Sequence, residues 1–165
     1  MRYRVIETEY GYVAILVSDK GLAGLALPAE SADRALWQLG RKAEQAVEDA
    51  ALLPGLVDRL QRYFAGEVVD FPDTPDLSAG TDFQQRVWQA ARLIPRGETR
   101  SYGWVAAQAG SPRGFRATGQ AMGKNPVPVI VPCHRVIAGD GTIGGFSSGL
   151  DRKRLLMSLE SIRVR

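Results

Sequence analysis

Hydrophobic positions in the first part of the chain alternate with polar ones or form short apolar runs. This pattern predicts three strands, over residues 3–9, 12–18 and 22–27, with a hairpin turn at Asp19-Lys20-Gly21. The spacing of apolar residues then changes to three and four, which predicts a helix over residues 31–50. A further helix is predicted over residues 56–65, ending at Gly66.

The second half of the chain begins after a connector rich in proline and acidic residues, over residues 67–80. Thr81 and Gln84 then have the spacing of a capping box, and the helix they open has apolar residues on one stripe. That stripe consists of Phe83, Val87, Trp88 and Ala91. Ser101 caps another helix, and Gly110-Ser111-Pro112 separates it from a helix over residues 114–124. Two short helices around a glycine-containing turn are typical of a helix-turn-helix.

The rest of the chain is expected to be less regular. Residues 129–137 are rich in β-branched side chains and are predicted to be extended, and residues 143–149 form a glycine-rich loop. A last helix is predicted over residues 150–161, burying Leu155, Leu156 and Leu159. The expected fold is therefore α/β (α+β), in two domains. Residues 1–75 form a small sheet with flanking helices, residues 76–80 connect, and residues 81–165 form a mostly helical domain with a short active-site strand.

The second helix of the predicted helix-turn-helix has unusually small side chains. Ala117 and Ala121 form one row, which suits contact with a neighbouring helix. Arg116, Gly119, Gln120 and Gly123 form another face, which suits close approach to a DNA groove. Both interpretations remain open from the pattern alone.

Charge is distributed unevenly along the chain. Residues 1–80 carry 8 basic and 13 acidic side chains, whereas residues 81–165 carry 13 basic and 5 acidic ones, which together give the net charge of +3. The basic half indicates either an anionic partner, nucleic acid first, or simply a solvated basic surface. No apolar run approaches the roughly 20 residues of a membrane helix, and the N-terminus has no apolar signal core, so we expect a cytoplasmic protein.

The chain has one cysteine and one histidine, Cys133 and His134, and they are adjacent. This excludes an internal disulfide and a zinc site built from cysteine and histidine, and we expect no metal. A cysteine attacks as thiolate, and a histidine held by a carboxylate is the usual way to form one. In an extended run the two side chains point to opposite faces, so contact needs a local bend or a bridging water.

The carboxylate that could orient His134 must come from elsewhere in this half of the chain. The candidates are Asp82, Glu98, Asp140, Asp151 and Glu160. Glu160 directly follows the predicted buried stripe of the last helix, which makes it the one most suited to point inward. On residue type alone, however, a single cysteine in a β-branched run is more often a small core residue than a nucleophile.

Four sequence segments, taken in their order along the chain, instead favour a nucleophilic cysteine. Residues 125–137 read Asn-Pro-Val-Pro-Val-Ile-Val-Pro-Cys-His-Arg-Val-Ile, and they follow characteristic segments at residues 81–88, 95–103 and 116–122. Together they resemble the O6-alkylguanine-DNA alkyltransferases, also called methylated-DNA–protein-cysteine methyltransferases. The resemblance extends from about Gly80 to Glu160, whereas residues 1–75 match only in their strand-then-helix order.

The resemblance implies DNA repair by direct, irreversible transfer of an alkyl (methyl) group from O6 of guanine in duplex DNA to Cys133. The reaction is a single turnover and uses no cofactor. His134 corresponds to the base that takes the thiol proton through a water, and Glu160 to the carboxylate that orients it. Asn125 ties the recognition helix to the active-site segment, and Tyr102 donates to the flipped base and stabilises the leaving guanine.

The resemblance also implies the partner, double-stranded DNA containing O6-alkylguanine, entered from the minor groove by a protein that acts as a monomer. Cooperative binding along DNA is left open. Arg116 takes the place of the extruded nucleotide. The implied DNA-contacting residues are Arg116, Ala117, Gly119, Gln120, Ala121, Lys124 and Arg135. The implied base-pocket residues are Val136, Gly144, Phe146 and Ser147, where Phe146 replaces a tyrosine found in many members.

Three other functions compete with this one. A non-catalytic relative could bind alkylated bases and flag them, although such proteins replace the acceptor cysteine that this chain keeps. A helix-turn-helix regulator with a structural cysteine would bind a specific DNA sequence and would not need Tyr102, His134 and Glu160 together. A thiol hydrolase would need an oxyanion hole, and no segment of the sequence indicates one.

Overall fold

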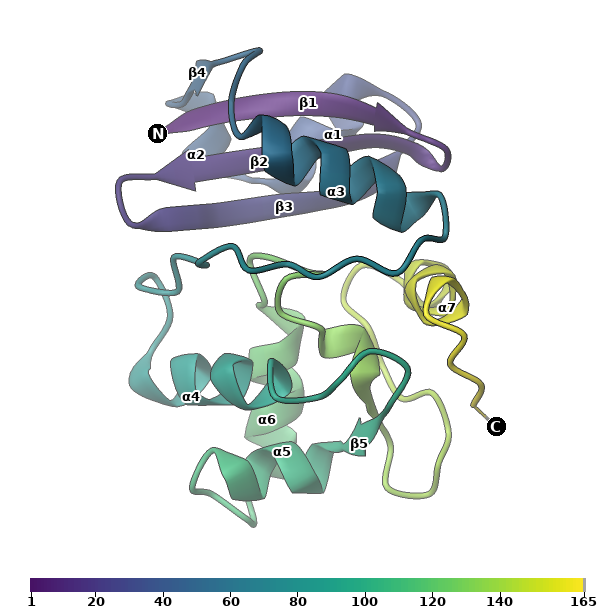
Figure 1. Cartoon of the computed structure of the whole chain (residues 1–165). Coiled ribbons are helices and arrows are strands. Elements are labelled where there is room, and N and C mark those ends of the chain that lie inside the picture. Colours follow the sequence, from purple (N-terminus) through teal and green to yellow (C-terminus); the bar gives the residue numbers. More distant parts are fainter. Residues whose placement is uncertain (165) are drawn as a thin grey trace. The chain divides into compact units, whose positions relative to one another are not determined.

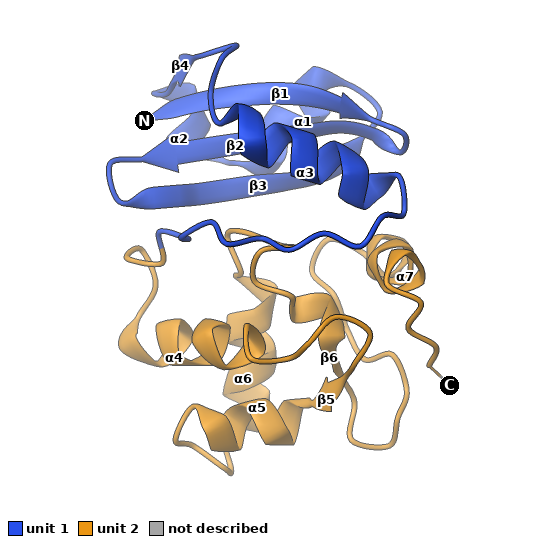
Figure 2. Ribbon diagram, in the orientation of Figure 1, with its two compact units in different colours: residues 1–76 blue, residues 77–165 orange. Residues whose placement is uncertain are grey.

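The computed structural model describes residues 1–164, which fold into two compact units. Unit 1 comprises residues 1–76, and unit 2 begins at residue 77 (Figure 2). Both helices and strands are present, with the sheet of unit 1 much larger than that of unit 2, so the predicted mixed α/β fold class is confirmed.

Unit 1 is built on a four-stranded sheet (Figure 1). Its strands are β1 (Arg2–Thr8), β2 (Gly11–Ser18), β3 (Gly21–Ala29) and β4 (Val47–Glu48), in the order β3-β2-β1-β4. The first three pair antiparallel, whereas β4 runs parallel to β1. The three predicted strands are thus present. They form because alternation places Val13 and Ile15 on one face and Ala14 on the other, all fully buried.

The helices of unit 1 cover both faces of this sheet. Helix α1 (Ala32–Gln38) lies behind the sheet in Figure 1, and α3 (Pro54–Phe64) lies in front. Ala35 of α1 packs on Ala14 and Ala26, while α3 buries Leu56, Leu60, Tyr63 and Phe64.

The predicted single helix over residues 31–50 is wrong. The chain leaves α1 at Gly40, which has φ +71°, then forms the short α2 (Arg41–Glu44) and strand β4. Only a glycine adopts that left-handed conformation at little cost, and a helical spacing of alanines and leucines does not reveal it. The proline-containing segment 67–76 ends unit 1 and pairs with β3, since Leu22 N–H donates to Thr74 O at 2.9 Å.

Unit 2 contains three consecutive helices. Helix α4 (Asp82–Ala91) opens with the predicted capping box at Thr81 and Gln84, and it is followed by α5 (Tyr102–Gln108) and α6 (Phe115–Gly123). The indole N–H of Trp88 donates to Ala121 O at 2.8 Å, which ties α4 to α6. Ser101 caps α5 as predicted, and α5, the turn at Gly110 and α6 form a helix-turn-helix.

The segment after α6 packs without regular structure. Residues 127–132 are buried, and Val129 lies at φ +76°, a strained conformation for a β-branched residue. The extended run predicted over residues 129–137 is wrong in its middle, because a 3₁₀ helix, η1 (Cys133–Arg135), interrupts it. Only β6 (Val136–Ile137) is a strand, pairing in parallel with β5 (Arg100–Ser101).

The last helix, α7 (Leu150–Leu159), ends one residue before Glu160. Leu156 is buried as predicted, but Leu155 and Leu159 are only half-buried, and Met157 and Lys153 occupy the interior instead. The buried face of α7 is therefore rotated from the one predicted. It carries a lysine into the core of unit 2.

Candidate active site

Cys133 begins the 3₁₀ turn η1 and is 5% exposed. The Asn125 side-chain amide holds the segment in place, donating to Val131 O at 2.8 Å and to Cys133 Sγ at 3.1 Å, while its oxygen accepts from Val127 N–H at 3.0 Å. One side chain at the end of α6 therefore fixes both the buried loop and the thiol.

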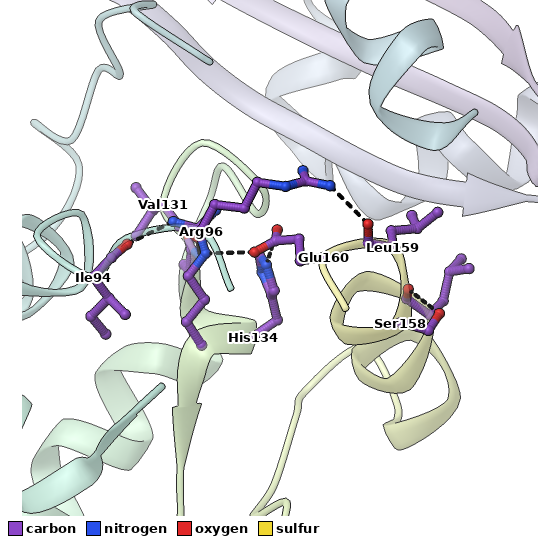
Figure 3. A network of polar contacts seen from close by, with 10 residues as sticks. Ile94, Arg96, Val131, His134, Ser158, Leu159 and Glu160 are labelled. Atoms are coloured by element: carbon purple, nitrogen blue, oxygen red, sulfur yellow. Dashed lines mark hydrogen bonds and ion pairs between the residues drawn. The ribbon is translucent and has the colours of Figure 1, made fainter. Parts of the chain in front are cut away.

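A buried charged cluster includes His134, the residue that follows Cys133 in the sequence (Figure 3). His134 Nε2 lies 2.5 Å from Glu160 Oε2, and Arg135 Nε donates to Glu160 Oε1 at 2.7 Å. Arg135 also donates to Ile94 O at 2.7 Å. Glu160, 25 residues or more away in sequence, thus uses one oxygen for each partner, and of the five candidate carboxylates it is the one bonded to His134.

The protonation states follow from these contacts. Although burial alone would raise it, hydrogen bonds from His134 and Arg135 bring the pKa of Glu160 down to about 2. An ionised carboxylate only accepts hydrogen bonds, so His134 Nε2 carries the proton that they share. Burial lowers the pKa of His134 despite the hydrogen bond to Glu160, so its second nitrogen, Nδ1, is an unprotonated acceptor at neutral pH.

That second nitrogen can accept a proton. His134 Nδ1 is fully buried and has no hydrogen-bond partner among the described protein atoms. Burial raises the pKa of the Cys133 thiol to about 11, an effect that the Asn125 amide and the charge of Lys153 oppose. A buried thiol of this kind needs a base to become a nucleophile, and a neutral histidine polarised by a carboxylate can act as one.

Cys133 opens onto a cavity of about 840 Å³ whose wall is mostly apolar. Of the predicted site residues, six line it: Tyr102, Arg116, Gly119, Cys133, Phe146 and Ser147. Helix α6 forms one wall, the start of α5 another, and residues 138–147 a third. The cavity therefore brings together segments from across unit 2 at the single cysteine.

The glycine-rich loop over this cavity is held by Lys153. Its Nζ donates to three carbonyls, those of Val136 at 2.7 Å, Ile143 at 2.6 Å and Gly145 at 3.0 Å. Burial lowers the pKa of Lys153 to about 8, although the neighbouring Cys133 raises it. The Tyr102 hydroxyl also donates to Gly145 O, at 3.2 Å, so both side chains fasten the loop at one carbonyl.

Tyr102 is further constrained by Gly144. A Cβ at Gly144 would lie 3.0 Å from the Tyr102 ring, and the backbone there has φ +73°, so both space and conformation require glycine. Gly144 thus supports the cavity from behind Tyr102 and does not line it. Burial raises the pKa of Tyr102, against the effect of its hydrogen bond to Gly145, which keeps the hydroxyl a donor at neutral pH.

Most of the predicted DNA-contacting residues lie at the surface, on or beside α6. Arg116, Ala117, Gln120 and Lys124 are exposed and Gly119 is half-buried, all on or beside α6. Ala117 is therefore free of the neighbouring helix that its alanine row suggested.

Three predicted contacts are corrected by the structure. Ala121 is buried and its carbonyl accepts from Trp88, so it packs α6 against α4. Arg135 turns inward to Glu160, leaving its side chain 15% exposed. Val136 is fully buried and lies outside the cavity lining, since its strand pairs with β5. In each case the residue supports the site from inside.

Sequence reasoning missed several residues of the site. Lys153 carried a signal, because it lies three residues before Leu156 on the buried face of α7, but a buried lysine is rare enough to be passed over. Phe115, Met122, Ala138 and Gly139 also line the cavity. Nothing in the local pattern distinguished them from ordinary surface or core residues.

Residues 1–164 contain neither a metal-binding cluster of side chains nor a membrane-spanning helix. No group of three or more histidine, cysteine, aspartate or glutamate side chains there could hold a metal ion. None of the described helices is long and apolar enough to cross a membrane.

Comparison with known families matches both units. Residues 82–162 match the 6-O-methylguanine DNA methyltransferase, DNA binding domain, and residues 1–75 match the 6-O-methylguanine DNA methyltransferase, ribonuclease-like domain.

Individual proteins agree with these matches. The methylated-DNA–protein-cysteine methyltransferase of Mycobacterium bovis is 53% identical over 116 residues, 70% of each chain. That of Mycolicibacterium paratuberculosis is 40% identical over 162 residues, 97% of this chain and 92% of its own. The crystal structure of Mycobacterium tuberculosis OGT in complex with DNA superposes with a TM-score of 0.81 at 42% identity, covering 97% of this chain and 92% of that one. The chain belongs to the 6-O-methylguanine DNA methyltransferase family.

Proposed function

We propose that this protein repairs DNA by transferring an alkyl group, methyl in the simplest case, from O6 of guanine in duplex DNA to Cys133. The reaction is irreversible and each molecule acts once, as a methylated-DNA–protein-cysteine methyltransferase. The observation that carries the proposal is the position of Cys133. It lines a cavity of about 840 Å³, and the next residue in the sequence, His134, is hydrogen-bonded to Glu160.

The transfer can be written as one displacement in which Cys133, His134 and Glu160 each take part. As the bond from Sγ to the alkyl carbon forms, the bond from that carbon to O6 breaks, and its electron pair stays on the guanine. The thiol proton passes through a water to His134 Nδ1, and Glu160 stabilises the imidazolium that results. The product is a thioether, which has no leaving group that water can displace readily, so the acceptor is not regenerated.

Groups at the cavity wall suit the leaving guanine. Tyr102 presents a hydroxyl that remains a donor at neutral pH and can exchange its contact with Gly145 O for the base. Ser147 and Phe146 bring the loop backbone and a second ring to the same cavity. We assign Tyr102 and the Ser147 backbone as donors to the base.

The target oxygen lies within a stacked duplex, so the nucleotide must be extruded before reaction, at a cost of about a few kcal/mol. We assign Arg116, exposed on α6 at the rim of the cavity, as the side chain that fills the gap. Ala117, Gly119 and Gln120 give α6 a face of small and polar residues suited to the minor groove, whose limited sequence information matches damage at any site. Lys124 provides a nearby positive charge for phosphate.

We further propose that the protein acts as a monomer. The acceptor must remain a free thiol, which suits a reducing compartment such as the cytoplasm. The single cysteine makes each molecule a one-use reagent, so repair capacity equals the number of unreacted molecules.

Replacing Cys133 tests the proposal directly. Cys133→Ala should abolish transfer of a labelled methyl group from duplex DNA while lesion affinity stays within about threefold of wild type, since the thiol is not a main binding group. Retained transfer in Cys133→Ala would contradict the assignment of the acceptor. Tight lesion binding without transfer in the wild-type protein would identify a non-catalytic damage binder instead.

A further inference from the structure

Phe115 is an aromatic residue that the fold of unit 2 does not use. It is the first residue of α6 and is 58% exposed. In the described part of unit 2 the other aromatic side chains are buried or half-buried. Burying an aromatic ring in an apolar environment is more favourable than leaving it in water, so the exposure of Phe115 beside the cavity calls for an explanation.

The ring lies at the mouth of the cavity that contains Cys133. Phe115, Gly119 and Met122 follow one another at spacings of four and three along α6, and all three line the cavity. Met122 is buried at the inner end of this stripe, while Phe115 is exposed at the outer end, directly beside Arg116. A nucleotide entering the cavity must therefore pass next to both side chains.

The turn before α6 places this ring firmly. Gly114 N–H donates to Ser111 O at 2.8 Å, and Thr118 N–H donates to Gly114 O at 2.8 Å. A Cβ on Gly114 would lie 2.6 Å from Ser111 Oγ, so the turn is tight because this position is glycine. Phe115 thus leaves a fixed point of the backbone, whereas the long Arg116 side chain can adjust.

Extrusion of a nucleotide leaves two base faces without a stacking partner. A guanidinium can fill the gap and form hydrogen bonds, but an apolar ring covers an exposed base face better. Inserted phenylalanine or leucine side chains hold kinked or opened base steps in many minor-groove proteins. Aromatic stacking also accepts any base, which suits a lesion in any sequence.

We propose that Phe115 is a second intercalating residue, which stacks on the base pair next to the extruded nucleotide while Arg116 occupies the gap. This inference rests on the proposed function, because it assigns the ring to the duplex that the repair reaction requires. Phe115 acts on DNA opening and does not contact the reacting atoms. It is therefore a positioning residue.

The test separates opening of the duplex from chemistry. Single-turnover rates of transfer to Cys133 are measured for wild type, Phe115→Ala and Phe115→Tyr, with a duplex containing O6-methylguanine and with free O6-methylguanine base. Phe115→Ala should slow the duplex reaction about tenfold and change the free-base reaction by less than about threefold, whereas Phe115→Tyr should retain the duplex rate. Trp37→Ala removes an exposed aromatic of unit 1 and should change neither rate.

A second readout separates an apolar wedge from a charge contact. Duplex affinity is measured against salt concentration for Phe115→Ala and for Lys124→Ala. Loss of the ring should weaken binding and leave the slope of log affinity against log salt unchanged, whereas loss of Lys124 should reduce the slope by about one.

Equal losses on duplex and free base would overturn the proposal, because the ring would then be a wall of the base pocket. No loss on duplex would overturn it as well. Wild-type protein that transfers from neither substrate would instead overturn the proposed function itself, so the two failures are distinguishable.

Discussion

The interiors of the two units differ in chemistry. Within residues 1–164, the buried polar and charged side chains all belong to unit 2. They are Thr118, His134, Lys153 and Glu160. The buried residues of unit 1 are apolar, with Tyr63 the most polar of them. Unit 1 also uses a regular sheet covered by helices, whereas much of unit 2 consists of loops around the thiol.

This contrast indicates that the buried side chains of unit 1 stabilise its fold, whereas the buried charged side chains of unit 2 need another explanation. Replacing a buried ion pair with apolar residues often leaves stability unchanged or improves it, so a charged cluster is a poor way to stabilise a fold. Unit 2 keeps such a cluster, in which His134 and Arg135 contact Glu160, and Lys153 donates to three carbonyls. We propose that these groups determine where the protons lie around Cys133 and hold the neighbouring loop in place.

The largest effect is expected from Glu160→Gln. It leaves Arg135 buried without its carboxylate partner and removes the charge that stabilises a protonated His134. We expect a loss of about 4 kcal/mol in the free energy of unfolding and a fall in the rate of methyl transfer of about a hundredfold or more.

Denaturant unfolding and single-turnover kinetics measure the two effects of Glu160→Gln separately. The matched control is Glu98→Gln, which removes an exposed carboxylate of the same unit that forms an ion pair with Arg100. A Glu160→Gln protein that transfers at the wild-type rate would show that the cluster is structural only.

Acid should destabilise unit 2 by the next largest amount. The pKa of Glu160 falls from its ordinary 4.5 to about 2 on folding, so between these values the unfolded chain binds more protons and stability falls as pH falls. The lowered pKa of His134 acts in the same direction, beginning below its ordinary value of 6.5. For Glu160 the loss is on the order of 3 kcal/mol across the window.

Unfolding free energies between pH 7 and pH 2 measure this dependence. Glu160→Gln should flatten the part of the curve below pH 4.5, because it removes the titrating group. An equally steep curve in that variant would place the acid sensitivity elsewhere in the molecule.

The smallest effect is expected in the apolar interior of unit 1. Ile15 is fully buried in β2, and Ile15→Val removes one methylene. We expect a loss of about 1 kcal/mol in unfolding free energy and no change in the transfer rate per folded molecule. A slower transfer in Ile15→Val at full folding would show that the sheet of unit 1 takes part in the reaction, and the contrast between the units would fail.

The sequence predicts the regular parts of both units well, because local spacing determines them. The strands of unit 1 follow from alternation, and α4 follows from the capping pair Thr81 and Gln84. The break at Gly40 was missed, since a single glycine fits a helical pattern equally well.

The interior of the site depends on contacts that local spacing does not encode. Arg135 was expected on DNA, but its partner Glu160 lies 25 residues away and turns it inward. The turn at Cys133 depends on Asn125, eight residues earlier. Local spacing does not predict the role of Lys153, because its acceptors are the carbonyls of β6 and of a loop whose path the sequence does not show.

The mass of the intact protein tests most directly whether Cys133 accepts one alkyl group from O6 of guanine. Purified protein is mixed with a short duplex carrying a single O6-methylguanine, and the mass of the intact protein is measured. We expect a gain of one CH₂ that maps to Cys133 and saturates at one per molecule. An unchanged mass in the presence of excess lesion, or a gain at another residue, would contradict it.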